Sequence, residues 1–295
     1  MLAELFAVMA PVLIVAGIGY AWSRSGQAFP TDFVTRLVLN VGTPSLVLSS
    51  LSRTRIEPHA FAQMALGCVL ASLAMGLLGL LLSRALRSDW KVLVPAYLFP
   101  NTGNMGLPIS LYAFGEQGLS LAVAFFLMLS VTQFTLGMLL AGVERSWRRL
   151  LINPTVLSLA AALAVMGCDL QLPRWLANTV NLLGGMTIPM MLLTLGVSLA
   201  SIRVRHLGQG VLLGALRILA GAGAGWLIGE LLDLAPLARG VLVMQSAMPV
   251  AVFNYLFALR ANRSPEAVAS LVLCSTLLSF VLLPLLLLWL LPGVR

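Results

Sequence analysis

Long apolar stretches constrain this chain more than any other feature of its sequence. Ten of them follow one another, at residues 4–22, 33–52, 60–83, 92–114, 119–142, 152–169, 175–200, 208–232, 238–259 and 266–291. An α-helix needs about 20 apolar residues to cross about 30 Å of hydrocarbon, and each stretch meets that requirement. The stretches lack the two-residue alternation of a membrane β-barrel strand. The sequence therefore predicts an all-α integral membrane protein with ten transmembrane helices.

The low charge content excludes a soluble fold. Only 9% of the 295 residues are charged and the mean hydropathy is +0.99, whereas soluble domains carry about a quarter charged residues. A formal charge of +8 would suggest nucleic acid in a soluble protein, but here most basic residues stand in short loops between apolar stretches. We therefore expect the lipid bilayer as a partner and no nucleic acid.

The chain shows no motif for a cofactor, a metal ion or a covalent catalytic step. Its cysteines, Cys68, Cys168 and Cys274, lie far apart within or beside apolar stretches, and His59 and His206 stand in loops. Small buried residues are the interpretation favoured for the cysteines. We expect no cofactor and no metal, with sodium bound by carbonyl and amide oxygens left open.

The basic residues predict the orientation in the membrane. The loops after the first, third, fifth, seventh and ninth stretches hold 12 of the 18 Lys and Arg residues, whereas the remaining loops and the tails hold 5. Cytoplasmic loops carry an excess of Lys and Arg, so the first set of loops faces the cytoplasm. Both termini then lie on the non-cytoplasmic side of the cell (inner) membrane.

The two halves of the sequence, residues 1–145 and 146–295, echo each other. Prolines recur at offsets of 141–145 residues, in the pairs Pro11 and Pro154, Pro30 and Pro173, Pro44 and Pro189, Pro95 and Pro236, and Pro108 and Pro249. Each half holds five apolar stretches, and an odd number inverts the second copy in the membrane. Inverted repeats of this kind are typical of secondary transporters. Chance recurrence of helix prolines is the alternative.

Two of the stretches are predicted to be broken helices. The stretch 92–114 contains the letters FPNTGNMGLPIS, in which Pro100 and Pro108 remove backbone donors and clash with the preceding turn. The stretch 238–259 has Pro249 at a related place. Broken backbone inside a membrane is tolerated where it faces protein or a water-filled cavity, and half-helix N-termini suit an anion. We expect Pro108 and Pro249 to mark the breaks of the two helices.

The polar residues beside these prolines are the candidate binding site. Asn101, Thr102, Asn104, Gln245 and Ser246 are predicted to contact a substrate, and Asn104 falls on Gln245 at an offset of 141. The alternative is that these side chains only satisfy the broken backbone. Further candidates for the cavity lining are Thr43, Ser45 and Asn254. Arg217 lies inside the stretch 208–232, where it either snorkels or pairs, or balances an anion in the pathway.

The stretch FPNTGNMGLPI resembles the crossover of the auxin efflux carrier family. The resemblance extends to VLNVGTPSLVLSSL, to MPVAVFNYLFALRANRSPEAV and to LSFVLLPLLLL, and so covers the whole chain. It implies two inverted five-helix repeats in a fold like that of the bile-acid sodium symporters. The first, second, sixth and seventh helices would form a scaffold, and the third to fifth with the eighth to tenth a moving transport domain.

The resemblance also implies a role for Asn101, which matches the substrate-contacting asparagine of the family. It places Pro108 and Pro249 at the positions where the two broken helices cross. The chain lacks the long hydrophilic loop of the plant members between the fifth and sixth helices, so it resembles a compact bacterial member. Relatives suggest a homodimer.

A secondary transporter of small organic anions is the function that these features predict. The anions are carboxylates such as malonate, malate or auxin-like acids, carried by an elevator-type alternating-access movement. An intramembrane enzyme is one alternative, but it would need a nucleophile with a base, or a metal set, at mid-depth, and the sequence offers neither. A non-transporting membrane sensor or scaffold is the other alternative.

Overall fold

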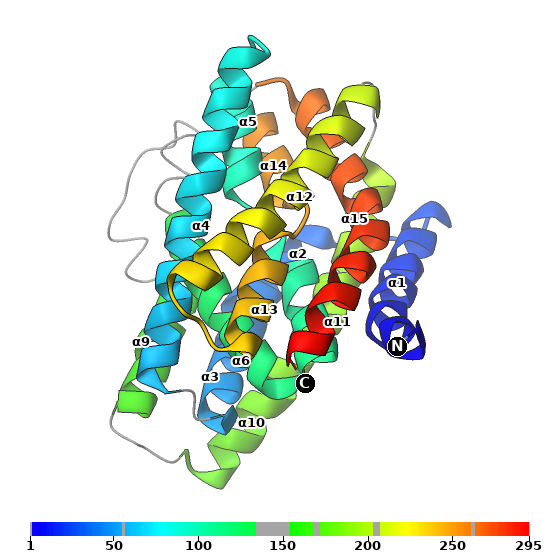
Figure 1. Cartoon of the computed structure of the whole chain (residues 1–295). Coiled ribbons are helices and arrows are strands. Elements are labelled where there is room, and N and C mark those ends of the chain that lie inside the picture. The colour runs from blue at the N-terminus through cyan, green and yellow to red at the C-terminus, as the bar shows by residue number, and fades with distance from the viewer. Residues whose placement is uncertain are drawn as a thin grey trace.

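The computed structural model describes residues 2–54, 57–133, 154–167, 172–202, 207–260 and 263–294. These residues form a bundle of helices of unequal length, and both termini lie toward the same end of it (Figure 1). Among them the only strand-like pairing is one isolated β-bridge, which joins Pro100 to Val250. An all-α architecture is therefore confirmed for the described part of the chain.

The unbroken helices follow the predicted stretches closely. They are α1 Leu2–Arg24, α4 Pro58–Ala85, α12 Leu207–Leu231 and α15 Pro265–Val294. The stretch 33–52 is divided into α2 Thr31–Leu37, the π-helical turn η1 Val38–Gly42 and α3 Thr43–Thr54, and the stretch 175–200 into α10 Arg174–Gly185 and α11 Thr187–Ser201. The remaining elements are α5 Trp90–Leu98, the π-helical turn η2 Thr102–Gly106, α6 Leu107–Thr132, α9 Pro154–Gly167, α13 Pro236–Ser246 and α14 Val252–Arg260.

Seven helices of the described residues are long and apolar enough to cross a membrane. Three features explain why this number differs from ten. The stretches 92–114 and 238–259 are each divided by a break, α9 has 14 described residues, and α6 bends at Gly115 (φ 68°, ψ −163°), so that it carries parts of two predicted spans. A multi-span membrane protein is thus confirmed, whereas ten spans in two inverted repeats stay a prediction.

Helix packing separates two groups of helices. In the first, α1 packs along α11, and α3 packs against α9 and α10. In the second, α12 packs against α13, α15 and α4, while α4 also packs against α5 (Figure 1). We call these the α1/α11 group and the α12 group. The segment α6 contacts members of both groups, because it touches α3 and α1 as well as α4 and α13.

The contact between α1 and α11 depends on two glycines that let the backbones approach closely. A Cβ atom on Gly196 would lie 1.9 Å from the carbonyl oxygen of Ala16, and one on Gly19 would lie 2.2 Å from that of Leu193. Lipid tails are as apolar as the side chains, so close van der Waals packing replaces the hydrophobic effect as the force that holds membrane helices together. Glycine at these positions therefore makes the α1/α11 group rigid.

Gly196→Ala is expected to destabilise this contact. The added methyl group collides with the backbone of α1, and overpacking of this kind costs about 1–3 kcal/mol. The melting temperature of the detergent-purified protein should fall. Gly17→Ala is the matched control, because a Cβ atom there meets nothing within 4 Å. Equal melting temperatures for the two variants would contradict the packing described here.

Candidate functional site: a cavity at the crossing of two broken helices

The first break separates α5 from η2. The helix α5 ends at Leu98, Phe99 takes extended angles (φ −112°, ψ 88°), and the helical path resumes at Thr102 after Asn101 (φ −79°, ψ 56°). Pro100 is the local cause, because its ring disfavours the helical conformation of the residue before it and it has no N–H to donate. The break therefore follows directly from the sequence Phe-Pro-Asn.

The second break separates α13 from α14. The helix α13 ends at Ser246 and α14 begins at Val252, with Pro249 in the non-helical residues between them. The same steric argument applies, since Met248 precedes a proline. Both breaks leave backbone amides and carbonyls without a partner in their own helix.

The two breaks satisfy each other across an antiparallel bridge. The N–H of Asn101 donates to the carbonyl of Pro249 at 2.7 Å, and the N–H of Ala251 donates to the carbonyl of Phe99 at 3.2 Å. We call the paired segments Phe99–Asn101 and Pro249–Ala251 the crossover. In a hydrocarbon environment an unpaired backbone group costs several kcal/mol, so each break stabilises the other.

Side chains complete the hydrogen bonding of the crossover. The Asn254 Nδ2 atom donates to the carbonyl of Phe99 at 3.0 Å, and the N–H of Val250 donates to Ser275 Oγ at 3.1 Å. Asn254, predicted to line the cavity, is thus buried beside the crossover as a brace. Ser275 of α15 was not singled out from the sequence, because a serine in a long apolar helix carries no distinguishing pattern.

The structure corrects the predicted position of the first break. Pro108 lies in the first turn of α6, buried and in a helical region, eight residues beyond Pro100. The helix continues through Pro108, because Gly106 (φ −64°, ψ −45°) and Leu107 (φ −62°, ψ −50°) before it keep helical angles and the turn before it is the π-helical η2. The bridge consequently aligns Pro100 with Val250, so Pro108 does not cross Pro249.

Asn104 and Gln245 were predicted to stand at equivalent places in the two breaks, but the structure places their side chains in different surroundings. Gln245 is buried beneath the crossover, where its Nε2 atom donates to Ser110 Oγ at 3.1 Å. Its Oε1 atom lies so near Gly106 that a Cβ atom there would be 2.3 Å away. Gln245 therefore joins α13 to α6 and η2, whereas Asn104 faces a cavity.

That cavity has a volume of about 650 Å³ and lies between the crossover and the α1/α11 group. We call it the crossover cavity. Three predicted site residues, Asn101, Thr102 and Asn104, line it, whereas Gln245, Ser246, Thr43, Ser45 and Asn254 do not. The other lining residues come from α2, η1, α6, α11 and α14 and include Thr35, Arg36, Phe126, Gln133, Met191, Thr194, Ser198, Phe253 and Tyr255.

Asn101 lines this cavity and carries an unused, buried donor. Its side chain is 4% exposed, and its Nδ2 atom has no hydrogen-bond partner. Leaving a buried donor unsatisfied costs about 1–3 kcal/mol, so the cavity is a place where an acceptor would be stabilised. The rim carries charges of both signs, since exposed Asp32 and Arg36 both line the cavity. The Arg36 Nε atom donates to the carbonyl of Asp32 at 3.2 Å.

Thr194 and Ser198 are lining residues that the sequence reasoning missed. They lie four residues apart on α11, and Met191 precedes Thr194 by three. Residues three and four apart share one face of a helix, so the polar stripe was visible in principle. The signal is weak, because Leu195 and Val197 stand between its members and no proline lies beside them.

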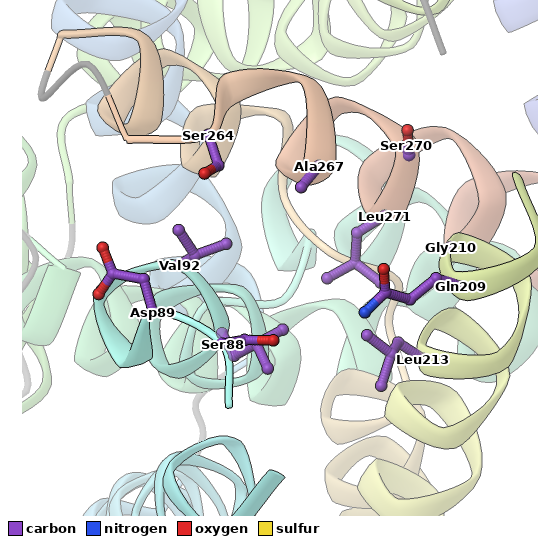
Figure 2. Close-up of a pocket in the computed structure, with 11 residues that line it drawn as sticks. Ser88, Asp89, Val92, Gln209, Gly210, Leu213, Ser264, Ala267, Ser270 and Leu271 are labelled. Atoms are coloured by element: carbon purple, nitrogen blue, oxygen red, sulfur yellow. The ribbon is translucent and has the colours of Figure 1, made fainter. Parts of the chain in front are cut away.

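A second, smaller cavity of about 210 Å³ lies within the α12 group, away from the crossover. Figure 2 shows Ser88 and Asp89 at one side, Gln209 and Leu213 of α12 at another, and Ser264 to Leu271 above them. Asp89 caps α5 by accepting from the N–H of Lys91 at 2.9 Å, and it accepts from Arg263 Nη1 at 2.8 Å. These contacts tie the loop before α5 to the start of α15.

The Asp89 carboxyl has a pKa below its ordinary value. Partial burial acts to raise the pKa, but the hydrogen bond from Lys91 N–H and the ion pair with Arg263 together outweigh that effect. A carboxyl group whose pKa is lowered by folding stabilises the folded state above its unfolded pKa. That stabilisation is lost as the pH falls through the folded-state value.

Asp89→Asn should therefore lower the melting temperature at neutral pH and lose this effect in acid. The difference between the variant and the parent should shrink below about pH 4, as the native Asp89 becomes protonated. Melting curves from neutral to acidic pH test this, with exposed Glu116→Gln as the matched control. A difference that stays constant with pH would show that the ion pair contributes nothing.

Asn254→Ala should loosen the crossover. The substitution removes the bond to the Phe99 carbonyl, and one buried hydrogen bond is worth about 0.5–1.5 kcal/mol. The melting temperature of the purified protein should fall by more than it does for Asn40→Ala, a change at an exposed asparagine of η1. If both variants melt alike, Asn254 is not a brace.

The comparisons with known proteins agree with a transporter. A family model described as membrane transport protein matches residues 5–144 and 135–287. The chain is 27% identical over 288 residues to an uncharacterized transporter of Methanothermobacter thermautotrophicus, in an alignment that covers 93% of this chain and 94% of that protein. It is 23% identical over 292 residues to an uncharacterized transporter of Methanocaldococcus jannaschii, covering 93% and 95%. This multi-span helical chain belongs to the membrane transport protein family, and its resemblance to the auxin efflux carriers is confirmed.

Proposed function

We propose that the protein is a secondary transporter that carries small organic anions, carboxylates such as malonate, malate or auxin-like acids, across the cell (inner) membrane. One observation carries the proposal. Asn101 stands where the two broken helices meet and lines a cavity of about 650 Å³, and its buried Nδ2 donor has no hydrogen-bond partner. An unused donor on a residue that lines a cavity of that size suits a ligand with an acceptor group.

The helix starts at the crossover favour a negative charge on that ligand. The helical path from Thr102 to Thr132 and the helix α14 both begin next to the crossover. Thr102 and Asn104 from the first start, and Val252 and Phe253 from the second, line the cavity. Helix N-termini carry partial positive charge and free N–H groups, and in transporters they face anionic substrate groups.

The remainder of the lining fits an organic body. Phe126, Met191 and Val197 offer apolar surface, whereas Thr194 and Ser198 offer hydroxyl groups. Small-molecule sites are mostly apolar with a few placed polar groups, and the crossover cavity matches that description. A carboxylate at Asn101 with its carbon skeleton toward α11 satisfies both parts of the lining.

The position of the cavity supports an elevator-type movement. Its walls come from the crossover, η2, α6 and α14 on one side and from α2, η1 and α11 on the other. Sliding one group along the other would carry the crossover to the opposite face of the membrane. The Gly196 contact keeps the α1/α11 group rigid during such a movement.

The present conformation is inward-facing if the basic loops are cytoplasmic. Rim residues Thr31 and Asp32 begin α2, Ser201 ends α11 and Ile202 follows it. These ends adjoin the loops that hold the excess of Lys and Arg, which the positive-inside rule places in the cytoplasm. Both termini lie toward one end of the bundle, which we assign to the non-cytoplasmic side (Figure 1).

A flux assay separates this function from an intramembrane enzyme and from a sensor or scaffold. Only a transporter moves a labelled acid across a sealed bilayer. Purified protein in proteoliposomes should take up labelled malonate, malate or indole-3-acetate, with rates that saturate and with counterflow from the opposite side. Turnover of the acid without flux would favour an enzyme, and binding without either would favour a sensor.

Asn101→Ala should reduce uptake without loss of folded protein. Removing a hydrogen bond to a charged group costs about 1.5–3 kcal/mol, which corresponds to a fall of about tenfold to a hundredfold in affinity. Initial uptake rates across a range of acid concentrations measure the effect, and exposed Asn178→Ala is the matched control. If Asn101→Ala has the same uptake kinetics as the parent at equal protein content, Asn101 does not bind the substrate.

A further inference from the structure

A buried cation contacts the end of α13, the half-helix that leads into the crossover. Arg217 of α12 is 1% exposed, and its Nη1 atom donates to the carbonyl of Ser246 at 2.8 Å. Ser246 is the last residue of α13, three residues before Pro249. The guanidinium therefore holds the carbonyl end of the half-helix that leads into the second break. The end of a helix carries about half a negative charge, which such a cation offsets.

Two glycines of α12 let the end of α13 approach the Arg217 guanidinium closely. A Cβ atom on Gly221 would lie 2.1 Å from the Ser246 carbonyl oxygen and 2.7 Å from Arg217 Nη1. A Cβ atom on Gly225 would lie 2.8 Å from the Cα atom of Val243. Glycine at both positions lets α13 approach α12 closely, so the contact with Arg217 is built into the packing.

The preceding turn of α12 is hydrogen-bonded to the first broken helix. The Tyr97 hydroxyl of α5 donates to the carbonyl of Leu213 at 2.9 Å, and Leu213 lies one turn before Arg217. Tyr97 stands two residues before Phe99, where the first break begins. Arg217 thus sits at a point of α12 that contacts both broken helices, and any change there acts on the crossover.

No carboxylate of the described residues pairs with Arg217. The ion pairs described there are Glu230 with Arg239 and Asp89 with Arg263, and all four of these side chains are at least partly exposed. A buried charge without a counter-charge costs several kcal/mol. Further, the Arg217 Nε atom has no hydrogen-bond partner. Burying an unpaired guanidinium is unfavourable, and glycines at two positions maintain its contact, so we infer that Arg217 has a role beyond packing.

Coupling ions suggest that purpose. In carriers with broken helices, the unwound carbonyls and the C-terminal ends of half-helices are the groups that coordinate a co-transported cation. Here a permanently charged side chain already donates to such an end. A guanidinium stays protonated at every physiological pH and cannot dissociate from the protein.

We propose that Arg217 is a resident cation of the crossover, which stabilises the carbonyl end of α13 in place of a sodium ion and lets the carrier move its organic anion without co-transported sodium. The inference rests on the proposed transport function. Arg217 does not line the crossover cavity, so its role is to position the crossover and to supply positive charge behind it. A coupling cation that binds and leaves in each cycle is then unnecessary.

The unsubstituted protein provides the first test. Exchange of labelled malonate and of labelled indole-3-acetate is measured in proteoliposomes at zero membrane potential, with sodium chloride or choline chloride on both sides. Equal rates support the inference, and a saturable rise with sodium overturns it. The melting temperature of the purified protein in the same two salts gives a readout that needs no transport, because a bound ion raises it. Stabilisation specific to sodium overturns the inference as well.

Variants of Arg217 provide the second test. Arg217→Ala should slow exchange in choline by on the order of tenfold or more, since it removes a charge-assisted hydrogen bond. Adding guanidinium at millimolar concentration should restore exchange, whereas urea, a neutral molecule of the same shape, should not. Arg217→Lys should retain most of the activity. Arg239→Gln, at a partly exposed arginine of α13, is the matched control.

The outcomes distinguish a resident cation from a packing residue and from a failed function. Rescue by urea as well as by guanidinium, or an equal loss in Arg217→Lys and Arg217→Ala, would make Arg217 a packing residue and overturn the inference. If the unsubstituted protein transports neither probe in either salt, the proposed function fails for those acids. The melting temperatures in sodium and choline still decide the inference in that case.

Discussion

The mutual hydrogen bonding of two interrupted helices is the constraint on which the rest of this structure depends. A helix that crosses a membrane satisfies its own backbone, and a proline that breaks it exposes polar groups to hydrocarbon. Here the backbone bonds between Asn101 and Pro249, and between Ala251 and Phe99, return those groups to a paired state. Either break alone would leave unpaired backbone groups in the membrane interior and would be strongly unfavourable. The crossover therefore has to be buried in protein, and a cavity beside it is lined by backbone ends and by short polar side chains.

Two kinds of packing hold the crossover in place. Glycines at the contact of α1 with α11 make one wall of the cavity stiff, and glycines of α12 let α13 approach the buried Arg217. Asn254 and Ser275 then bond the breaks from the side of α14 and α15. The result is a polar centre that is held by contacts from both helix groups.

The fold class was predictable from the sequence because long apolar stretches directly indicate segments that lie in lipid. Apolar stretches located the helices, and Pro249 located one break. The prediction went wrong at Pro108, since equal spacing in the two halves does not distinguish a proline that interrupts a helix from one through which the helix continues. Pro100 breaks the helix, because Phe99 is forced into an extended conformation before it.

The candidate site was predictable only in part for a related reason. Asn101, Thr102 and Asn104 adjoin the break and line the cavity, as expected from their neighbourhood. Gln245 and Ser246 adjoin the other break but lie beneath it, because the antiparallel crossing turns the end of α13 toward α12 and α6. Thr194 and Ser198 come from a helix that has no break near them, so only the packing of α11 across the cavity brings them to the site.

Accessibility of the cavity wall is the most direct test of an anion-carrying crossover between two helix groups. Ser198→Cys, in a background that lacks Cys68, Cys168 and Cys274, places one thiol on α11 facing the cavity. A membrane-impermeant maleimide is applied to sealed vesicles of known orientation, with and without malonate or indole-3-acetate. Labelling from the cytoplasmic side that a transported acid slows is the expected result. A thiol that reacts from neither side, or at a rate unchanged by any acid that the protein transports, would contradict a water-filled binding cavity at the crossover.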